Sequence, residues 1–133
     1  MPVHPRFWTG VFRFKGIWNC VVSILFFFGD DSLRSWLGVP NPDPAYRAMF
    51  LALAFTFGLG SWRVGQDLTV NRDIIRGGVI GQTSVFLVLA NEVLVARRLP
   101  VPFLIPGLVD LLFSVMFAVF LWQTADSIQG ELL

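Results

Sequence analysis

Four long apolar segments, separated by short polar ones, dominate the hydrophobic pattern of this chain. The hydrocarbon core of a bilayer is roughly 30 Å thick and takes about 20 apolar residues per helix. The apolar segments match that length and predict helices over about residues 7–29, 46–64, 74–96 and 103–124. We therefore expect an all-α protein, an integral membrane four-helix bundle that forms a single domain over residues 1–133.

The first helix must include charged residues to reach the length of a membrane span. Between Gly16 and Gly29 the chain rises only about 21 Å, which is too short to cross the hydrocarbon core. The helix must therefore begin near Phe7, and this places the Lys15 amine inside the membrane. Arg13 can reach the interface through its flexible side chain, whereas Lys15 lies deeper.

Polar segments connect the predicted helices. Residues 30–44 end in a proline-rich run, which cannot form a regular helix and acts as a stiff spacer. Trp36 in this connection is expected at headgroup level. Asn71 to Asp73 has the composition of a helix cap and first turn, and residues 126–133 form a short acidic tail.

A weak internal similarity appears at an offset of 60 residues. Residues 39–42 and 99–102 both contain two prolines, and each segment leads into an apolar helix that closes on a tryptophan, Trp62 or Trp122. Two parallel helical hairpins would produce this pattern, as parallel repeats do in some transporters. The preference of turns for proline and of membrane interfaces for tryptophan would also produce it.

Small residues form a stripe along each of the last three predicted helices. Helices associate in membranes through small residues, because lipid gives no hydrophobic drive between helices. These stripes predict close helix contacts inside the bundle or between protomers. The candidate packing positions are Ala54, Gly58, Gly77, Gly81, Gly107 and Ser114.

Six ionisable or amide residues within the apolar segments are the candidates for a ligand site or a buried polar cluster: Lys15, Asn19, Gln82, Asn91, Glu92 and Asp110. Charges at bilayer depth are costly and usually face a bundle interior, a partner or a water-filled path. Asp110 shares the small-residue stripe of its helix, so we expect it to face protein. Asn91 continues the stripe of the third helix.

Two arrangements of the charged residues are consistent with the sequence. In the first, Lys15 forms a buried ion pair with Asp110, because a paired charge costs less in hydrocarbon than an unpaired one. Asn19 and Gln82 would then be its hydrogen-bonding neighbours, with Glu92 nearer the mouth. In the second, Lys15 extends to the interface, and a neutral Asp110 bonds to Ser114 or a backbone carbonyl.

Composition and charge exclude several classes of function. Only 14% of the residues are charged and the net charge is +1, which excludes a general binder of nucleic acids. His4 is the only histidine and Cys20 the only cysteine. The sequence therefore offers no zinc site, no histidine-ligated haem in the helices and no thiol pair. We predict no catalytic residues and no cofactor, which favours a non-enzymatic protein.

Basic residues near the helix ends predict the orientation. Six lie on the side of the N-terminus and four on the other side: Arg6, Arg13, Lys15, Arg63, Arg72 and Arg76 against Arg34, Arg47, Arg97 and Arg98. Because cytoplasmic flanks carry an excess of lysine and arginine, both termini are expected in the cytoplasm. The expected location is the inner membrane of a bacterium.

A charged, glycine-bearing segment (Arg13, Lys15, Gly16) lies in the first helix, the segment 71–77 leads into the third, and Val109-Asp110 lies early in the last. In these features and in its layout the chain resembles, in outline, small four-helix bacterial membrane proteins of the DoxX-like kind. The resemblance implies a redox or quinone-linked function in the membrane. The lone Cys20 gives no thiol pair for that role, so no family active site is carried over.

Three functions follow from these features. The first is a small non-enzymatic membrane subunit that packs within a larger membrane complex or against copies of itself. The second is a binder or carrier of a lipophilic small molecule, a quinone or another lipid, held between helices. The third is a proton or ion pathway through Glu92, Asp110 and Lys15. The expected partners are the lipid bilayer, other membrane subunits or further copies, and a lipophilic ligand in the second case.

Overall fold

The computed structural model describes residues 4–29, 32, 35, 36, 38, 43–69 and 71–125. In this part of the chain it contains four long helices and no strand, which confirms the predicted all-α bundle. The helices are α1 (Pro5–Phe28), α3 (Pro44–Val64), α4 (Arg72–Ala90) and α5 (Leu104–Gln123). A short π-helix, η1 (Asn91–Val95), continues α4, and a 3₁₀ turn, η2 (Val101–Phe103), precedes α5.

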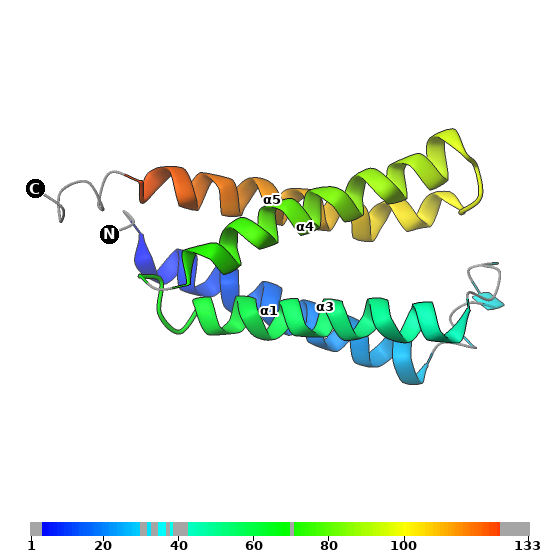
Figure 1. Cartoon of the computed structure of the whole chain (residues 1–133), viewed down its shortest axis with the longest axis horizontal. Helices are drawn as coiled ribbons and strands as arrows, with labels where there is room; N and C mark the ends of the chain where they lie inside the picture. Colours follow the sequence, from blue (N-terminus) through cyan, green and yellow to red (C-terminus); the bar gives the residue numbers. More distant parts are fainter. Residues whose placement is uncertain are drawn as a thin grey trace, which may run out of the picture.

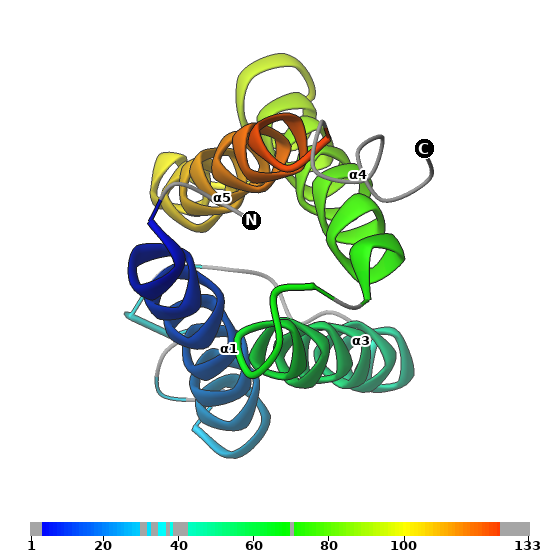
Figure 2. The same ribbon diagram turned by 90° about the vertical axis from the view of Figure 1, so that its left-hand side faces the viewer.

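The helices form two hairpins that lie against each other. Helix α1 packs along α3 and helix α4 packs along α5 (Figure 1). The hairpins converge at the end where α1 begins and α5 ends, and they diverge towards the opposite end (Figure 1). Viewed end-on, the four helices surround a common axis in the order α1, α3, α4, α5 (Figure 2).

Helix α3 begins two residues before the predicted boundary at Tyr46. Pro44 is its first residue, which a helix accepts because the first backbone N–H has no partner inside the helix. The Asp43 carboxylate caps the helix by accepting hydrogen bonds from the backbone N–H groups of Ala45 and Tyr46, at 2.8 and 3.3 Å. Of the predicted connection over residues 30–44, only residues 32, 35, 36, 38, 43 and 44 are described; residues 40–42 of the proline-rich run lie outside the described residues, as does the acidic tail.

Three segments of the described chain are long and apolar enough to cross a membrane: Pro5–Phe28, Arg72–Val95 and Val101–Gln123. The chain is therefore a membrane protein, and the apolar outer faces of these helices contact the lipid bilayer. Helix α3 was predicted as a fourth span but is not one of these three segments. Its mean hydropathy is too low, because arginines lie near both of its ends and small or polar residues interrupt its apolar run. It nevertheless runs alongside α1 (Figure 1) and exposes large apolar side chains such as Met49 and Leu53.

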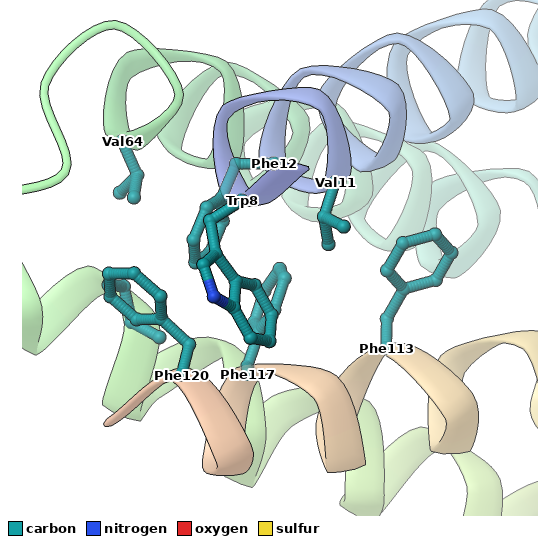
Figure 3. Close-up of a cluster of buried hydrophobic side chains, with 8 residues drawn as sticks. Trp8, Val11, Phe12, Val64, Phe113, Phe117 and Phe120 are labelled. Atoms are coloured by element: carbon teal, nitrogen blue, oxygen red, sulfur yellow. The ribbon is translucent and has the colours of Figure 1, made fainter. Parts of the chain in front are cut away.

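A cluster of buried aromatic and aliphatic side chains fills the end where the hairpins converge (Figure 3). The fully buried ring of Phe12 lies between Phe117 and Phe120 of α5, with ring centroids 4.6 and 5.1 Å apart. All four helices contribute to the cluster: Trp8, Val11, Phe12, Val64, Ile75, Phe113, Phe117 and Phe120. The hydrophobic core is therefore concentrated at one end of the bundle.

Two glycines allow the backbones of α1 and α3 to touch. A Cβ atom at Gly16 would lie 2.9 Å from both the Gly58 carbonyl oxygen and the Trp62 backbone nitrogen. A Cβ atom at Gly58 would lie 3.0 Å from the Gly16 carbonyl oxygen. Gly58 was among the predicted packing positions but Gly16 was not, although Gly16 and Cys20 form a pair of small residues one turn apart. Ala54, one turn from Gly58, is half-buried.

The contact between α4 and α5 uses other small residues. The Ser114 hydroxyl donates to the Val79 carbonyl oxygen at 3.0 Å and accepts from the Thr83 hydroxyl at 2.7 Å. A Cβ atom at Gly107 would lie 3.3 Å from the Leu89 side chain, and one at Gly78 would lie 3.1 Å from the Phe117 ring. These contacts hold the second hairpin together.

The structure corrects the predicted packing face of α4. A Cβ atom at Gly77 would meet no atom within 4 Å, and one at Gly81 would meet only the Phe57 ring, at 3.6 Å. The buried residues of this helix are Ile75, Gly78 and Gln82. The helix is thus rotated so that Gly78 rather than Gly77 faces the core, while Gly81 lies beside Phe57 of α3 and Ser84 and Asn91 are exposed. Neighbouring residues in the sequence point in different directions because each one turns the helix by about 100°.

We expect Gly16→Ala to lower the free energy of unfolding by about 1–3 kcal/mol, because the added methyl group meets backbone atoms that cannot move independently. The matched control is Gly10→Ala on the same helix, where a Cβ atom meets nothing within 4 Å. Unfolding in mixed micelles with increasing SDS, followed by circular dichroism, measures both. Equal stability of the two variants would contradict the close approach of α1 and α3.

Candidate functional site

Paired side chains connect the antiparallel helices α1 and α5 from the converging end inwards. The Trp8 indole N–H donates to the Gln123 side-chain oxygen at 3.2 Å. The buried ring of Phe12 follows, and Phe14 then stacks on Phe113 with ring centroids 6.0 Å apart. These contacts lead to the one ion pair that joins the two hairpins in the described part of the chain, between Lys15 and Asp110.

The Lys15 amine is completely buried and lies 2.5 Å from Oδ1 of Asp110. It also lies 5.1 Å from the centre of the Phe113 ring, whose face attracts a cation. Of the two arrangements open at the sequence level, the structure contains the buried pair. The alternative, in which Lys15 extends to the interface, is wrong because the Lys15 side chain has no exposed surface.

The pair lies well inside the membrane-spanning helices. Lys15 is about 15 Å along α1 from its start, and Asp110 is about 9 Å along α5 from its start. The Asp110 side chain retains 20% exposure, so it forms the less enclosed side of the pair. Removing either partner would leave an uncompensated charge in a low-dielectric environment. The geometry therefore makes the pair a link between the two hairpins.

The two amides predicted as neighbours of the pair do not bond to it. Asn19 lies against α3, where its Cβ atom would be 3.1 Å from a Cβ atom at Gly58. Gln82 is buried in the bundle, and its side-chain oxygen has no hydrogen-bond partner in the described part of the chain. Gln82 is one turn of α4 from Gly78, which contacts Phe117, so we infer that Gln82 lies near the level of Phe113 and Lys15.

Glu92 and Asn91 belong to the end of α4 rather than to a central cluster. Glu92 forms an ion pair of 2.5 Å with Arg98, and its carbonyl oxygen accepts from the Arg98 backbone N–H at 2.8 Å. The carbonyl oxygen of Asn91 accepts from the Ala96 N–H five residues later, and the Asn91 side chain is exposed. The expectation of one cluster is therefore corrected: the six residues separate because the buried face of α4 passes through Gln82 and Val93, not through Asn91.

Sequence reasoning missed the role of Arg72. Its guanidinium donates to the carbonyl oxygens of Leu121 and Thr124, at 3.1 and 3.0 Å. These carbonyls lie at the C-terminal end of α5, where a cation interacts favourably with unpaired acceptors. No local signal could identify this contact, because the partners are about 50 residues apart. Arg72 thereby ties the start of α4 to the end of α5.

Among the described residues, Lys15 and Asp110 are the charged groups of the candidate site. Within the described ranges, no group of three or more histidine, cysteine, aspartate or glutamate side chains could hold a metal ion. The Cys20 thiol lies 3.9 Å from the Phe55 carbonyl oxygen, the acceptor for its weak hydrogen bond. The arrangement is therefore suited to joining helices.

We expect Lys15→Met and Asp110→Asn each to lower the free energy of unfolding by about 3–5 kcal/mol, because each leaves a buried charge without a partner. The double variant should lose much less than the sum. Unfolding of the wild type, the two single variants and the double variant in SDS-containing micelles measures this difference. The comparison pair is Glu92 and Arg98, whose arginine is exposed. Glu92→Gln and Arg98→Met should each lower the free energy of unfolding by about 1 kcal/mol or less. Additive losses for Lys15 and Asp110 would show that the two residues do not stabilise one another.

Gln82→Leu should leave stability unchanged or raise it by about 1 kcal/mol, because a buried acceptor without a partner costs about that much. Thermal unfolding in detergent measures the change. Gln82→Glu is the opposite control, since it places a charge at the same position and should destabilise. A clear loss of stability in Gln82→Leu would mean that the amide is bonded to a water molecule or ligand.

Comparisons with protein-family models, curated proteins and solved structures found no match for this chain. The resemblance to DoxX-like proteins therefore stays a prediction. The functional argument rests on the geometry of the helices, on the buried ion pair and on the surfaces that the bundle presents to the membrane.

Proposed function

We propose that the protein is a small non-enzymatic membrane subunit that associates with further copies of itself through the outer face of α4. The supporting observation is the direction of its small-residue stripe. Gly77 has open space where a side chain would be, Gly81 contacts only the Phe57 ring, and Ser84 and Asn91 are exposed. This face is defined by Gly77, Gly81, Ser84 and Asn91 and is called the α4 outer face below.

The spacing of these residues fits a helix–helix contact. Steps of four, three and seven residues keep them on one side of a helix. Small residues let a second helix approach closely, and the resulting backbone contact is the main source of packing energy between helices in lipid. The stripe contributes little to the bundle itself, because the bundle packs through Ile75, Gly78 and Gln82.

A second copy of the chain suits this face. Copies inserted in the same direction place identical residues at identical depths, so a two-fold axis along the membrane normal brings each α4 outer face against its counterpart. The Asn91 side chain carries both a donor and an acceptor and can bond to Asn91 of the second copy. Such polar contacts strengthen association between membrane helices.

The position of the charged residues supports a structural role over an ion pathway. Glu92 is paired with Arg98 at the end of α4, so it does not extend a line of charges from Lys15 and Asp110. The proposal includes a bacterial inner membrane with both termini in the cytoplasm, as the distribution of basic residues favours. Five arginines lie at the converging end of the bundle: Arg6, Arg13, Arg63, Arg72 and Arg76.

We expect the protein extracted in a mild detergent to be a dimer or small homo-oligomer by native mass spectrometry, and Gly77→Leu to be a folded monomer. The larger side chain fits the monomer, because the space at Gly77 is open, but it separates two approaching α4 helices. The matched control is Gly10→Leu, an equally open glycine on α1, which should keep the wild-type oligomer.

Two outcomes would contradict the proposal. The first is a monomeric wild type in several mild detergents and in lipid nanodiscs. The second is an oligomer that Gly77→Leu leaves intact. A further check is Asn91→Leu, which should weaken the oligomer without changing the thermal stability of the monomer, since the Asn91 side chain is exposed.

A further inference from the structure

An apolar groove of about 440 Å³ follows the contact between α1 and α5 on the surface of the converging end. Its deepest residues are Val11 and Phe113, which are 9% and 7% exposed. Figure 3 shows these two side chains extending towards each other from the two helices. Phe7, Phe14 and Met116 complete its apolar lining. A groove of this size matches the lower part of the range found for small-molecule sites.

The groove exists because one position on α1 has no side chain. Gly10 lies in its lining, and a Cβ atom at this position would meet no atom within 4 Å. The helices α1 and α5 meet through large side chains on both sides of Gly10, such as Trp8 with Phe120 and Phe14 with Phe113. A larger residue at position 10 would therefore enter the groove without disturbing the bundle.

Arg6 is the one charged residue of the groove and lies at its outer end. It is exposed in the first turn of α1 and makes no ion pair within the part of the chain that the structure describes. Trp8, two residues later, bonds to Gln123, and Trp122 is 77% exposed. An exposed tryptophan at the end of a membrane helix, such as Trp122, lies at the membrane–water interface. The bond of Trp8 to Gln123, the neighbour of Trp122, places Arg6 close to this level. From Arg6 to Phe14 the groove runs about 12 Å into the membrane.

We propose that this groove binds an acyl chain of an anionic phospholipid, whose phosphate is held by Arg6. The lining accepts a hydrocarbon chain along its length and offers no polar partner for a more polar ligand except at its outer end. Arginine binds phosphate oxygens through several N–H donors, and basic residues at the surface attract anionic lipids. The site is separate from the α4 outer face, so it extends the proposed function and does not depend on it.

The test adds equal amounts of phosphatidylglycerol and phosphatidylcholine with the same acyl chains to the delipidated protein in detergent. Native mass spectrometry then counts the lipids bound per chain. We expect the wild type to bind one phosphatidylglycerol per chain. Its affinity for phosphatidylglycerol should exceed that for phosphatidylcholine by about fivefold, because this is the gain that one basic residue near a membrane surface provides for an anionic lipid. Arg6→Gln should bind both lipids equally, and Gly10→Leu should bind neither.

Two controls separate this site from general effects. Arg76→Gln removes an arginine from the same end of the bundle, where it is paired with Asp73, and should keep the wild-type preference. Gly77→Leu fills the α4 outer face and should keep one bound lipid per chain even when it changes the oligomeric state. The proposal is overturned if the wild type binds the two lipids equally, if Arg76→Gln loses as much preference as Arg6→Gln, or if folded Gly10→Leu retains the lipid. If Gly10→Leu does not fold, the proposal is tested by Arg6→Gln, which changes an exposed residue and leaves the fold intact.

Discussion

A lysine amine in the middle of a membrane must find an opposite charge close to it, because water is not there to solvate it. Lys15 of α1 reaches Asp110 of α5, and the pair connects the two helical hairpins. Hydrophobic association cannot do this between helices that lipid already surrounds. The electrostatic contact therefore favours the arrangement in which these two hairpin surfaces face each other, and the packing around it adds van der Waals contacts.

The aromatic cluster at the converging end supports this contact. Phe12, Phe117 and Phe120 fill the space between the hairpins, and Arg72 binds the last carbonyls of α5. Inside the first hairpin, Gly16 and Gly58 bring the backbones of α1 and α3 into contact. The structure thus combines close backbone packing within a hairpin with large side chains between hairpins.

The outer surface of the bundle differs in composition from its interior, because lipid is the solvent there. Many exposed side chains of the described residues are large and apolar, such as Phe28, Leu87 and Val95, and suit contact with acyl chains without specificity. Two regions depart from this pattern. The α4 outer face is small and partly polar, which suits a second helix. The groove beside Gly10 is concave and ends in a charge, which suits a single lipid. Both interpretations start from glycines, Gly77 and Gly10, where an added Cβ atom would meet no other atom within 4 Å.

The sequence by itself determined the class of the protein, the four long helices of the described residues and most of their ends, because hydrocarbon thickness requires long apolar segments. It also identified Lys15 and Asp110 as costly charges that need an explanation. It could not determine which face of α4 is buried, since a rotation of about 100° exchanges Gly77 for Gly78 without changing the hydropathy pattern. Only the tertiary structure decided that Lys15 meets Asp110, that Asn19 and Gln82 do not bond to this pair, and that Glu92 binds Arg98. Each of these outcomes depends on the rotation and separation of whole helices, which are set by packing between residues far apart in the chain.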